Sequence, residues 1–262
     1  MKYENRVVLF LDILGFKSVI DKTINKDDTD NETSISSLFE TLNQMYHEVS
    51  WTNSKKMTSR VITQFSDSIV LSFLVEDSKE VAPFFEDIQA LIAMLVKRGI
   101  LCRGAISYGK LIHNNRIVFG PAMNEAYLTE SKAAFYPRVI LDKSLAYLLE
   151  GNLNFKKDDF FYQNPFLENI IEEDLDDKLY IDYIFRVKNI MNSEEYLFRH
   201  LPKLRKIITD GLRYKSPDIK VKFGWLKNKY NRTLIKLKSE FYNYGINDTT
   251  LITQIGKLKL IE

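Results

Sequence analysis

Two aspartates stand in apolar, strand-like stretches of the sequence, where a charged side chain needs a partner. Asp12 lies near the end of an almost wholly apolar run, residues 7–14, and Asp67 lies between two more, residues 59–65 and 68–74. A carboxylate in such surroundings is neutralised by protonation, by a basic partner or by a metal ion. Two of them at neighbouring strand ends could share divalent cations and so hold phosphate groups. The alternative is structural, with one aspartate capping a turn and the other serving a hairpin.

The residues around these aspartates predict the elements that would position them. Residues 7–14 indicate a buried strand, which Gly15 ends. Residues 59–65 and 68–74 predict a hairpin that turns at Asp67. Both aspartates are therefore expected at strand ends.

The rest of the first 190 residues indicates alternating helices and strands. Apolar residues at helical spacing, glycine breaks and a proline at a helix start set the helix limits. Helices are expected over residues 36–49 and 78–98 and from residue 120 to about residue 134. A second strand pair is expected over residues 100–108 and 110–118, with a turn at Gly109. The pattern is typical of an α+β fold, with helices packed on a mostly antiparallel sheet.

The final third has a different character and is expected to be a helical appendage. Residues 191–262 carry 15 Lys and Arg against 7 Asp and Glu, whereas the first 190 carry 22 against 28. Apolar stripes at helical spacing cover residues 193–212 and continue after Ser216-Pro217, a capped helix start. We therefore divide the chain into a catalytic domain, residues 1–190, and a C-terminal helical extension, residues 191–262.

Composition is that of an ordinary globular protein. The 262 residues are 45% hydrophobic and 27% charged, with a formal net charge of +2 and one cysteine, Cys102. No intramolecular disulfide is possible, and no apolar run approaches the roughly 20 residues of a membrane span. The basic residues of the final third alternate with apolar ones, so they indicate packing rather than nucleic-acid binding. These features favour a cytoplasmic protein with no membrane or nucleic-acid partner.

Four short motifs, in the same order along the chain, resemble those of class III nucleotidyl cyclases. They are residues 10–16 (FLDILGF), 65–70 (FSDSIV), 103–110 (RGAISYGK) and 119–131 (FGPAMNEAYLTES). The resemblance covers roughly residues 6–187. It implies that family's ferredoxin-like or palm-type antiparallel sheet with helices packed on it.

The resemblance also implies a set of residues that hold metal and triphosphate. Asp12 and Asp67 would bind two divalent cations per site, Mn²⁺ or Mg²⁺, with the backbone carbonyl of Ile13. Three backbone amides and one side chain would bind the triphosphate, namely those of Leu14, Gly15 and Phe16 and the amine of Lys110. Free N–H groups at a helix start favour such an anion.

Further residues of the resemblance place the site between two subunits. Asn124 matches the asparagine that orients the ribose of a nucleotide held by the other subunit, which implies a homodimer with two interfacial sites. The family's transition-state arginine falls on Leu128, and a leucine cannot stabilise phosphorane charge. Lys132, one helical turn on, or Arg103 could replace that arginine, as could Arg60.

The positions that read the base differ from both purine patterns of the family. They align with Thr63 and Ile117, beside Arg60, where adenine or guanine readers would have a lysine–aspartate or glutamate–cysteine type of pair. The chain is similar in this to the bacterial anti-phage pyrimidine cyclases of the Pycsar system, which share a stand-alone catalytic domain and a helical tail like residues 222–231. That resemblance implies conversion of UTP or CTP to cyclic UMP or cyclic CMP and pyrophosphate, a signal that a separate effector protein reads.

Three alternatives stay open from the sequence. One is a purine cyclase, using ATP or GTP, with an unusual base pocket. Another is a cyclase-like nucleotide-binding module without catalysis, which Leu128 would explain. The third is a polymerase-type palm, which also pairs two strand carboxylates but would need finger-like or thumb-like segments.

Overall fold

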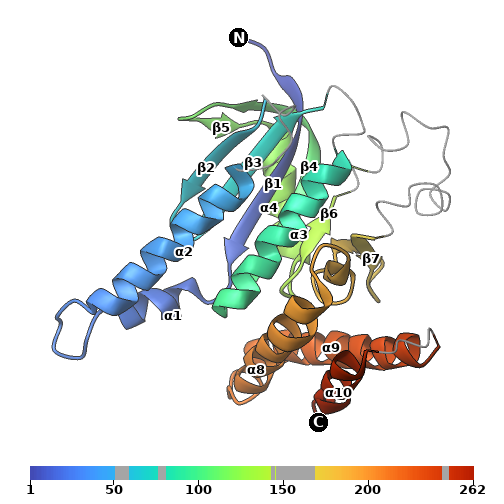
Figure 1. Ribbon diagram of the computed structural model, residues 1–262. Helices are drawn as coiled ribbons and strands as arrows, with labels where there is room; N and C mark the ends of the chain where they lie inside the picture. Colours follow the sequence, from blue (N-terminus) through green and yellow to red (C-terminus); the bar gives the residue numbers. More distant parts are fainter. Residues whose placement is uncertain (51–58, 76–80, 143–144, 146–168, 244–247) are drawn as a thin grey trace.

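The computed structural model describes residues 1–50, 59–75, 81–142, 145, 169–243 and 248–262, and its centre is one twisted sheet (Figure 1). The strands are β1 (Glu4–Ile13), β2 (Val61–Phe65), β3 (Ser68–Leu74), β4 (Cys102–His113), β5 (Val118–Phe119), β6 (Val139–Leu141), β7 (Ile171–Glu173) and β8 (Leu179–Ile181). Their order is β2-β3-β1-β4-β6-β8-β7, with β5 paired to β4. Only the β4–β6 pair is parallel among these described strands. The predicted α+β class with a mostly antiparallel sheet is confirmed.

Helices cover both faces of this sheet. They are α1 (Phe16–Ile20), η1 (Asp21–Thr23), α2 (Glu32–Ser50), α3 (Val81–Arg98), α4 (Pro121–Ala133), η3 (Arg186–Asn189), η4 (Glu195–His200), α8 (Leu201–Gly211), α9 (Pro217–Asn243) and α10 (Thr249–Lys257). Helices α2 and α3 lie on one face, whereas α4 lies behind β1 and β4 on the other (Figure 1). The helices expected over residues 36–49, 78–98 and 120–134 are thus confirmed within their described parts.

Strand β1 is central, and its alternation separates the two faces. Val7, Leu9 and Leu11 belong to the large buried cluster that includes the residues of α3. Because side chains alternate along a strand, Val8 and Asp12 face the other way, toward α4. Val8 accordingly packs in a small second cluster with residues of α4. Asp12 therefore lies on the α4 face, near the end of the central strand.

Gly120 allows α4 to lie close against β4. A Cβ atom at this position would stand 2.6 Å from the carbonyl oxygen of Lys110, and the φ of 144° disfavours any other residue. Pro121 follows as the first helical residue, where its missing N–H costs nothing. The sequence Gly-Pro thus fixes where α4 begins.

The turn predicted at Gly109 is wrong. Strand β4 runs through Gly109 from Cys102 to His113, and residues 102–111 all pair with β1. Gly109 is opposite Arg6 in this ladder, so long-range pairing with β1 overrides the local turn signal. The chain reverses instead after His113, where Val118 pairs back.

The C-terminal helices share the main core. Leu204 of α8 and Leu226, Tyr230 and Leu234 of α9 are buried in the same cluster as Leu9 of β1. Pro202 lies where the π-helical turn η4 gives way to α8, as its effect on helix geometry predicts. Helix α10 was not predicted. Its start is capped by the Asp248 carboxylate, which accepts from the N–H groups of Thr250 and Leu251.

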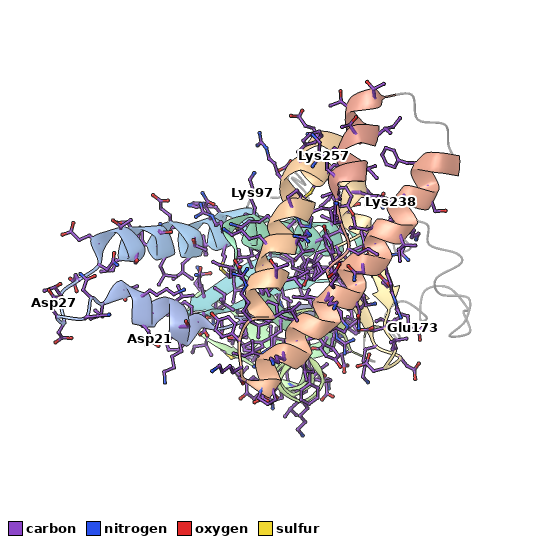
Figure 2. All side chains as sticks on the ribbon, turned by 90° about the horizontal axis from the view of Figure 1, so that it is seen from below. Asp21, Asp27, Lys97, Glu173, Lys238 and Lys257 are labelled. Atoms are coloured by element: carbon purple, nitrogen blue, oxygen red, sulfur yellow. The ribbon has the colours of Figure 1, made fainter. Side chains whose placement is uncertain are left out.

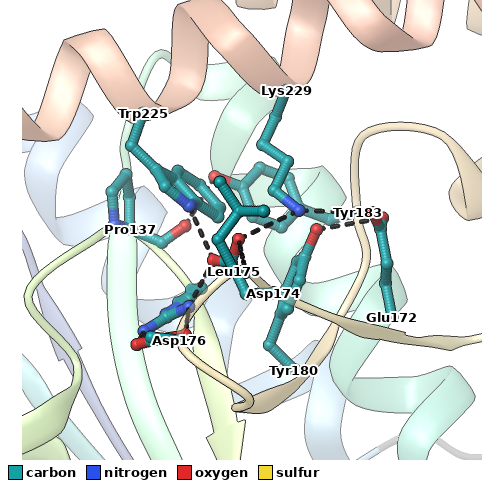
Figure 3. Close-up of polar contacts among 10 residues, drawn as sticks. Pro137, Glu172, Asp174, Leu175, Asp176, Tyr180, Tyr183, Trp225 and Lys229 are labelled. Atoms are coloured by element: carbon teal, nitrogen blue, oxygen red, sulfur yellow. Dashed lines mark hydrogen bonds and ion pairs between the residues drawn. The ribbon is translucent and has the colours of Figure 1, made fainter.

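A buried polar cluster joins α9 to the sheet (Figure 3). Trp225 Nε1 donates to Asp174 Oδ2 at 2.7 Å, and Lys229 Nζ lies 3.2 Å from carboxylate oxygens of both Asp174 and Glu172. Arg138, fully buried, pairs with Asp174 as well. Helix α9 is thereby held to β7 and to the turn after it.

The segment around η1 lies far from α9 and α10. Figure 2 shows Asp21 and Asp27 at the end formed by η1 and the loop after it, far from Lys238 of α9 and Lys257 of α10. None of the helices described here has the length and hydropathy needed to span a bilayer. The sequence also favours a short helix over residues 143–150, of which only residue 145 is described, and a strand over residues 160–162, which lies outside the described residues.

Candidate functional site

The structure brings Asp12 and Asp67 together. The backbone N–H of Ile13 donates to the carbonyl oxygen of Asp67 at 3.1 Å, and Asp12 is opposite Ser68 in the β1–β3 ladder. Ser66 has a φ of 55°, a conformation that the tight turn imposes on a non-glycine residue. Burial and then the Asp67 charge raise the pKa of Asp12. The two carboxylates thus lie close enough to repel each other.

Arg103 is the basic neighbour of this pair. It is opposite Asp12 in the β1–β4 ladder, and its Nε lies 3.6 Å from Asp12 Oδ2. The same Nε lies 2.5 Å from Glu130 Oε1, an ion pair whose geometry is not that of a hydrogen bond. Ser68 Oγ also donates weakly to Asp12, at 3.4 Å. Arg103 is therefore shared between two carboxylates.

The Asp12–Asp67 pair fits a hard divalent cation. The charge of Asp67 helps to raise the pKa of Asp12, so the pair gains from an ion that takes oxygen ligands. Among the residues described, no cluster of three or more His, Cys, Asp or Glu side chains could hold a metal. Mg²⁺ or Mn²⁺ sites commonly use one or two carboxylates and complete their shell with water and substrate phosphates. The backbone carbonyl of Ile13 is the third candidate ligand. Ile13 follows Asp12 in the sequence, and its backbone N–H donates to Asp67.

The predicted phosphate-binding amides differ in availability. The N–H of Leu14 already donates to the carbonyl oxygen of Leu101 at 2.8 Å. Gly15 has a φ of 75° and a Cβ there would touch nothing within 4 Å, so the backbone is open beside it. Phe16 then begins α1. Gly15 and Phe16 remain the candidates for a phosphate, whereas the Leu14 amide is committed to a backbone bond.

The predicted residues of α4 point away from the chain's own sheet. Ala122, Ala126 and Glu130 are the buried stripe of this helix. Asn124, Leu128 and Lys132 are exposed and lie roughly 200° around the helix from that stripe, two residues on. Asn124 and Lys132 therefore cannot reach Asp12 of the same chain.

Lys110 and Arg60 also lie away from Asp12 in one chain. Lys110 is opposite Asn5, seven residues along β4 from Arg103, or roughly 23 Å at strand spacing. The Arg60 side chain is 6% exposed, pairs with Asp87 of α3 at 2.9 Å and lies over the Phe84 ring. The structure therefore gives Arg60 a place in the packing against α3.

The two remaining base-pocket candidates are more accessible. Ile117 is 54% exposed, in the connection between β4 and β5. Thr63 is half-buried on β2, and its hydroxyl lies 3.0 Å from His113 Nε2. His113 in turn contacts Ser72, and Ser72 contacts Arg6. Burial and then the Arg6 charge lower the pKa of His113 to about 4.

Sequence reasoning missed Glu130 and His113. Glu130 is 2% exposed and burial raises its pKa, whereas the Arg103 charge, followed by that of Lys222 on α9, acts against that rise. The sequence did hold a signal for Glu130. It follows Ala122 and Ala126 at four-residue spacing, which places it on the same helix face, toward the sheet. His113 had no such signal, since its partners Thr63 and Ser72 are more than 40 residues away in sequence.

Comparison with known proteins shows only distant likeness. No protein-family description matches the chain, and no curated protein is similar in sequence. Among solved structures, the adenylyl cyclase CyaB from P. aeruginosa is 16% identical with a TM-score of 0.42, over 58% of this chain and 83% of that one. A bacterial light-regulated adenylyl cyclase is 14% identical with a TM-score of 0.39, over 56% and 80%.

A third similar structure is a class III adenylyl cyclase-like ATP-binding protein from Pseudomonas aeruginosa. It is 12% identical with a TM-score of 0.35, over 62% of this chain and 37% of that one. All three TM-scores lie below 0.5, so these likenesses carry no argument about substrate or mechanism.

Proposed function

We propose that this chain is a nucleotidyl cyclase that converts UTP or CTP to the 3′,5′-cyclic monophosphate and pyrophosphate. The observation that carries the proposal is the Asp12–Asp67 pair, held together at the end of the central strand by the Ile13–Asp67 backbone bond. The choice of a pyrimidine is supported by Thr63 and Ile117, which are neither of the purine-reading pairs expected at these positions.

Two divalent cations bound by Asp12, Asp67 and the Ile13 carbonyl would supply activation of the ribose 3′-hydroxyl and charge neutralisation at the triphosphate. The chain's own part is to position the substrate. The amides of Gly15 and Phe16 would hold phosphate oxygens. Arg103 balances Asp12 until a cation arrives and can then remain with Glu130, because it already contacts both carboxylates.

The exposed stripe of α4 supports a homodimer with shared sites. Asn124 and Lys132 point away from their own sheet and would act on a nucleotide held by Asp12 and Asp67 of a second copy. Lys110 would serve the triphosphate in the same way, from the partner. We also propose that the protein acts in the cytoplasm and that its cyclic product is an anti-phage signal for a separate effector protein.

The decisive experiment is an assay of product formation. The purified chain is incubated with each of the four nucleoside triphosphates and Mn²⁺ or Mg²⁺, and cyclic products are separated by chromatography. We expect cyclic UMP or cyclic CMP, and at least a hundredfold loss in Asp67→Ala, the scale on which removing a charge-stabilising group acts. Asp21→Ala, an exposed acid on η1, is the matched control. Product from no nucleotide, or full activity in Asp67→Ala, would contradict the proposal.

Two other functions have an observation in their favour. A purine cyclase shares the same carboxylate pair, and formation of cyclic AMP or cyclic GMP in the same assay would identify it. A nucleotide-binding module without catalysis is supported by Leu128, 40% exposed where an arginine is expected. Calorimetric binding of a nucleotide without turnover would favour that function.

A further inference from the structure

A chain of hydrogen bonds crosses the α4 face of the sheet, through four strands. Arg6 Nε on β1 donates to Ser72 Oγ on β3 at 2.9 Å. Ser72 Oγ lies 2.8 Å from His113 Nδ1 on β4, and His113 Nε2 lies 3.0 Å from Thr63 Oγ1 on β2. Arg6, Ser72 and His113 are 3%, 0% and 6% exposed, whereas Thr63 is half-buried. The chain therefore leads from a buried charge to the hydroxyl of a half-buried residue.

The direction of donation along this chain is determined by its first member. Arginine has only donors, so the Ser72 oxygen must accept from it. Ser72 then has one proton to give, and His113 Nδ1 is the only acceptor for it among the described residues. Leaving a buried hydroxyl proton without an acceptor is unfavourable, so Nδ1 is the unprotonated ring nitrogen. The proton of the neutral ring is on Nε2, which donates to Thr63.

Two features keep His113 in this neutral form. It is buried, and the Arg6 guanidinium is close; together they hold its pKa at about 4. Glu4 pairs with Arg6 at 2.7 Å from the exposed side, which leaves Arg6 charged but does not contact the ring. His113 therefore stays neutral at neutral pH, with its proton on Nε2.

Thr63 is left with a proton to donate. Its oxygen accepts from His113 Nε2, and the described residues offer no acceptor for its own proton. A hydroxyl that accepts from one group donates more strongly to the next, because hydrogen bonds in a chain polarise one another. Phe65, two residues on and 81% exposed, lies on the same face of β2. Thr63 thus offers a donor beside an exposed aromatic ring.

We propose that Thr63 is a specificity-determining donor that selects a nucleobase with a keto oxygen, uracil or guanine, over one with an amino group at the equivalent position, cytosine or adenine. The proposal rests on the proposed function. A carbonyl oxygen accepts the Thr63 proton, whereas an exocyclic amine can only donate to the second lone pair of the Thr63 oxygen and leaves the Thr63 proton without an acceptor. Arg6, Ser72 and His113 are positioning residues that set the polarity of Thr63. Among pyrimidine nucleotides the site would therefore take UTP.

The first test compares nucleotides in size-matched pairs. The ratio of kcat/KM for UTP over CTP, and for GTP over ATP wherever purines react, is measured for the wild type and two variants. We expect each ratio to favour the keto base, to fall roughly tenfold or more in Thr63→Val and to persist in Thr63→Ser, since one net hydrogen bond changes. A preference for CTP, or an unchanged ratio in Thr63→Val, would overturn the proposal.

The second test measures which nitrogen of the His113 ring is protonated and does not rely on activity. The ¹⁵N shifts of the three histidine rings distinguish the Nε2-protonated from the Nδ1-protonated form, and His113→Gln assigns the signal. Nε2 protonation at neutral pH supports the proposal, whereas Nδ1 protonation or a doubly protonated ring overturns it. Circular dichroism confirms that the variants fold.

Failure of the proposed function has a separate signature. If no nucleotide yields a cyclic product, calorimetry with UTP and with CTP decides the present proposal alone. Tighter binding of UTP that Thr63→Val abolishes would support it. Equal binding, tighter CTP binding or no binding of either would overturn it.

Discussion

The backbone N–H of Ile13 donates to the carbonyl oxygen of Asp67 at 3.1 Å, so the end of the central strand is tied to the turn of the β2–β3 hairpin. This one bond joins positions 54 residues apart in the sequence and sets the spacing of the two aspartates. A local change in either element should therefore alter the positions of both carboxylates.

The Asp12 carboxylate should be required for activity and should lower the stability of the folded protein. Burial and the neighbouring Asp67 charge raise its pKa, so the ionised carboxylate lowers the stability of the folded protein relative to the unfolded chain. We expect Asp12→Asn to abolish cyclase activity yet to raise the melting temperature in the absence of divalent cations. Mn²⁺ should stabilise the wild type and not this variant, as measured by thermal denaturation. A lower melting temperature in Asp12→Asn, without added metal, would show that the carboxylate is a net stabilising group.

Glu130 should control how closely Arg103 pairs with Asp12. Glu130→Gln removes the carboxylate 2.5 Å from Arg103, and Arg103 would then pair more closely with Asp12. Since a cation must displace that pairing, we expect the Mn²⁺ concentration for half-maximal activity to rise several-fold. Glu125→Gln, an exposed acid on the same helix, is the control. An unchanged metal requirement in Glu130→Gln would mean that Arg103 does not compete with the cation.

Complementation tests the shared sites of a homodimer. Asp67→Ala and Asn124→Ala should each be inactive, because each removes one half of every site. A mixed, co-refolded sample contains heterodimers in which one of the two sites is intact, and roughly a quarter of wild-type activity should return. Two inactive variants that stay inactive together would place Asn124 outside the site.

The buried polar cluster that joins α9 to the sheet should make the largest contribution to the stability of the appendage. Lys229→Met removes one of the two buried cations that pair with Asp174, which keeps Arg138, and removes the cation that pairs with Glu172. Breaking such buried pairs costs up to about 3–5 kcal/mol in urea unfolding. Trp225→Phe removes a single hydrogen bond to Asp174 and should cost about 1–2 kcal/mol. Arg232→Met, exposed on the same helix, should change the free energy of unfolding by less than about 0.5 kcal/mol.

Two buried histidines predict acid sensitivity. Burial is the main cause that lowers the pKa of both His113 and His200 to about 4, from an ordinary value of 6.5. The unfolded chain therefore binds protons that the folded chain does not, and stability is lost as the pH falls from about 6.5 to 4. Each histidine contributes on the order of 3 kcal/mol to this loss. His200→Asn should flatten the dependence of unfolding free energy on pH, whereas His47→Asn, an exposed site, should not.

The sequence by itself determined the elements and the positions of the two aspartates. The apolar run of β1, the hairpin turn at Asp67 and the Gly120-Pro121 start of α4 are local patterns, and local backbone preference was enough to place them. The same reasoning predicted a turn at Gly109, where pairing of β4 with β1 prevailed over the local signal.

Only the tertiary structure decided which side chains share an environment. It placed Arg60 against α3, brought Glu130 to Arg103, and linked Thr63 to His113 and Arg6 across four strands. Such neighbours depend on strand order and register, which bring together residues far apart in the sequence. A polar side chain also reveals its role only when its partner, its burial and its free proton are known together, and none of these is a property of the residue alone.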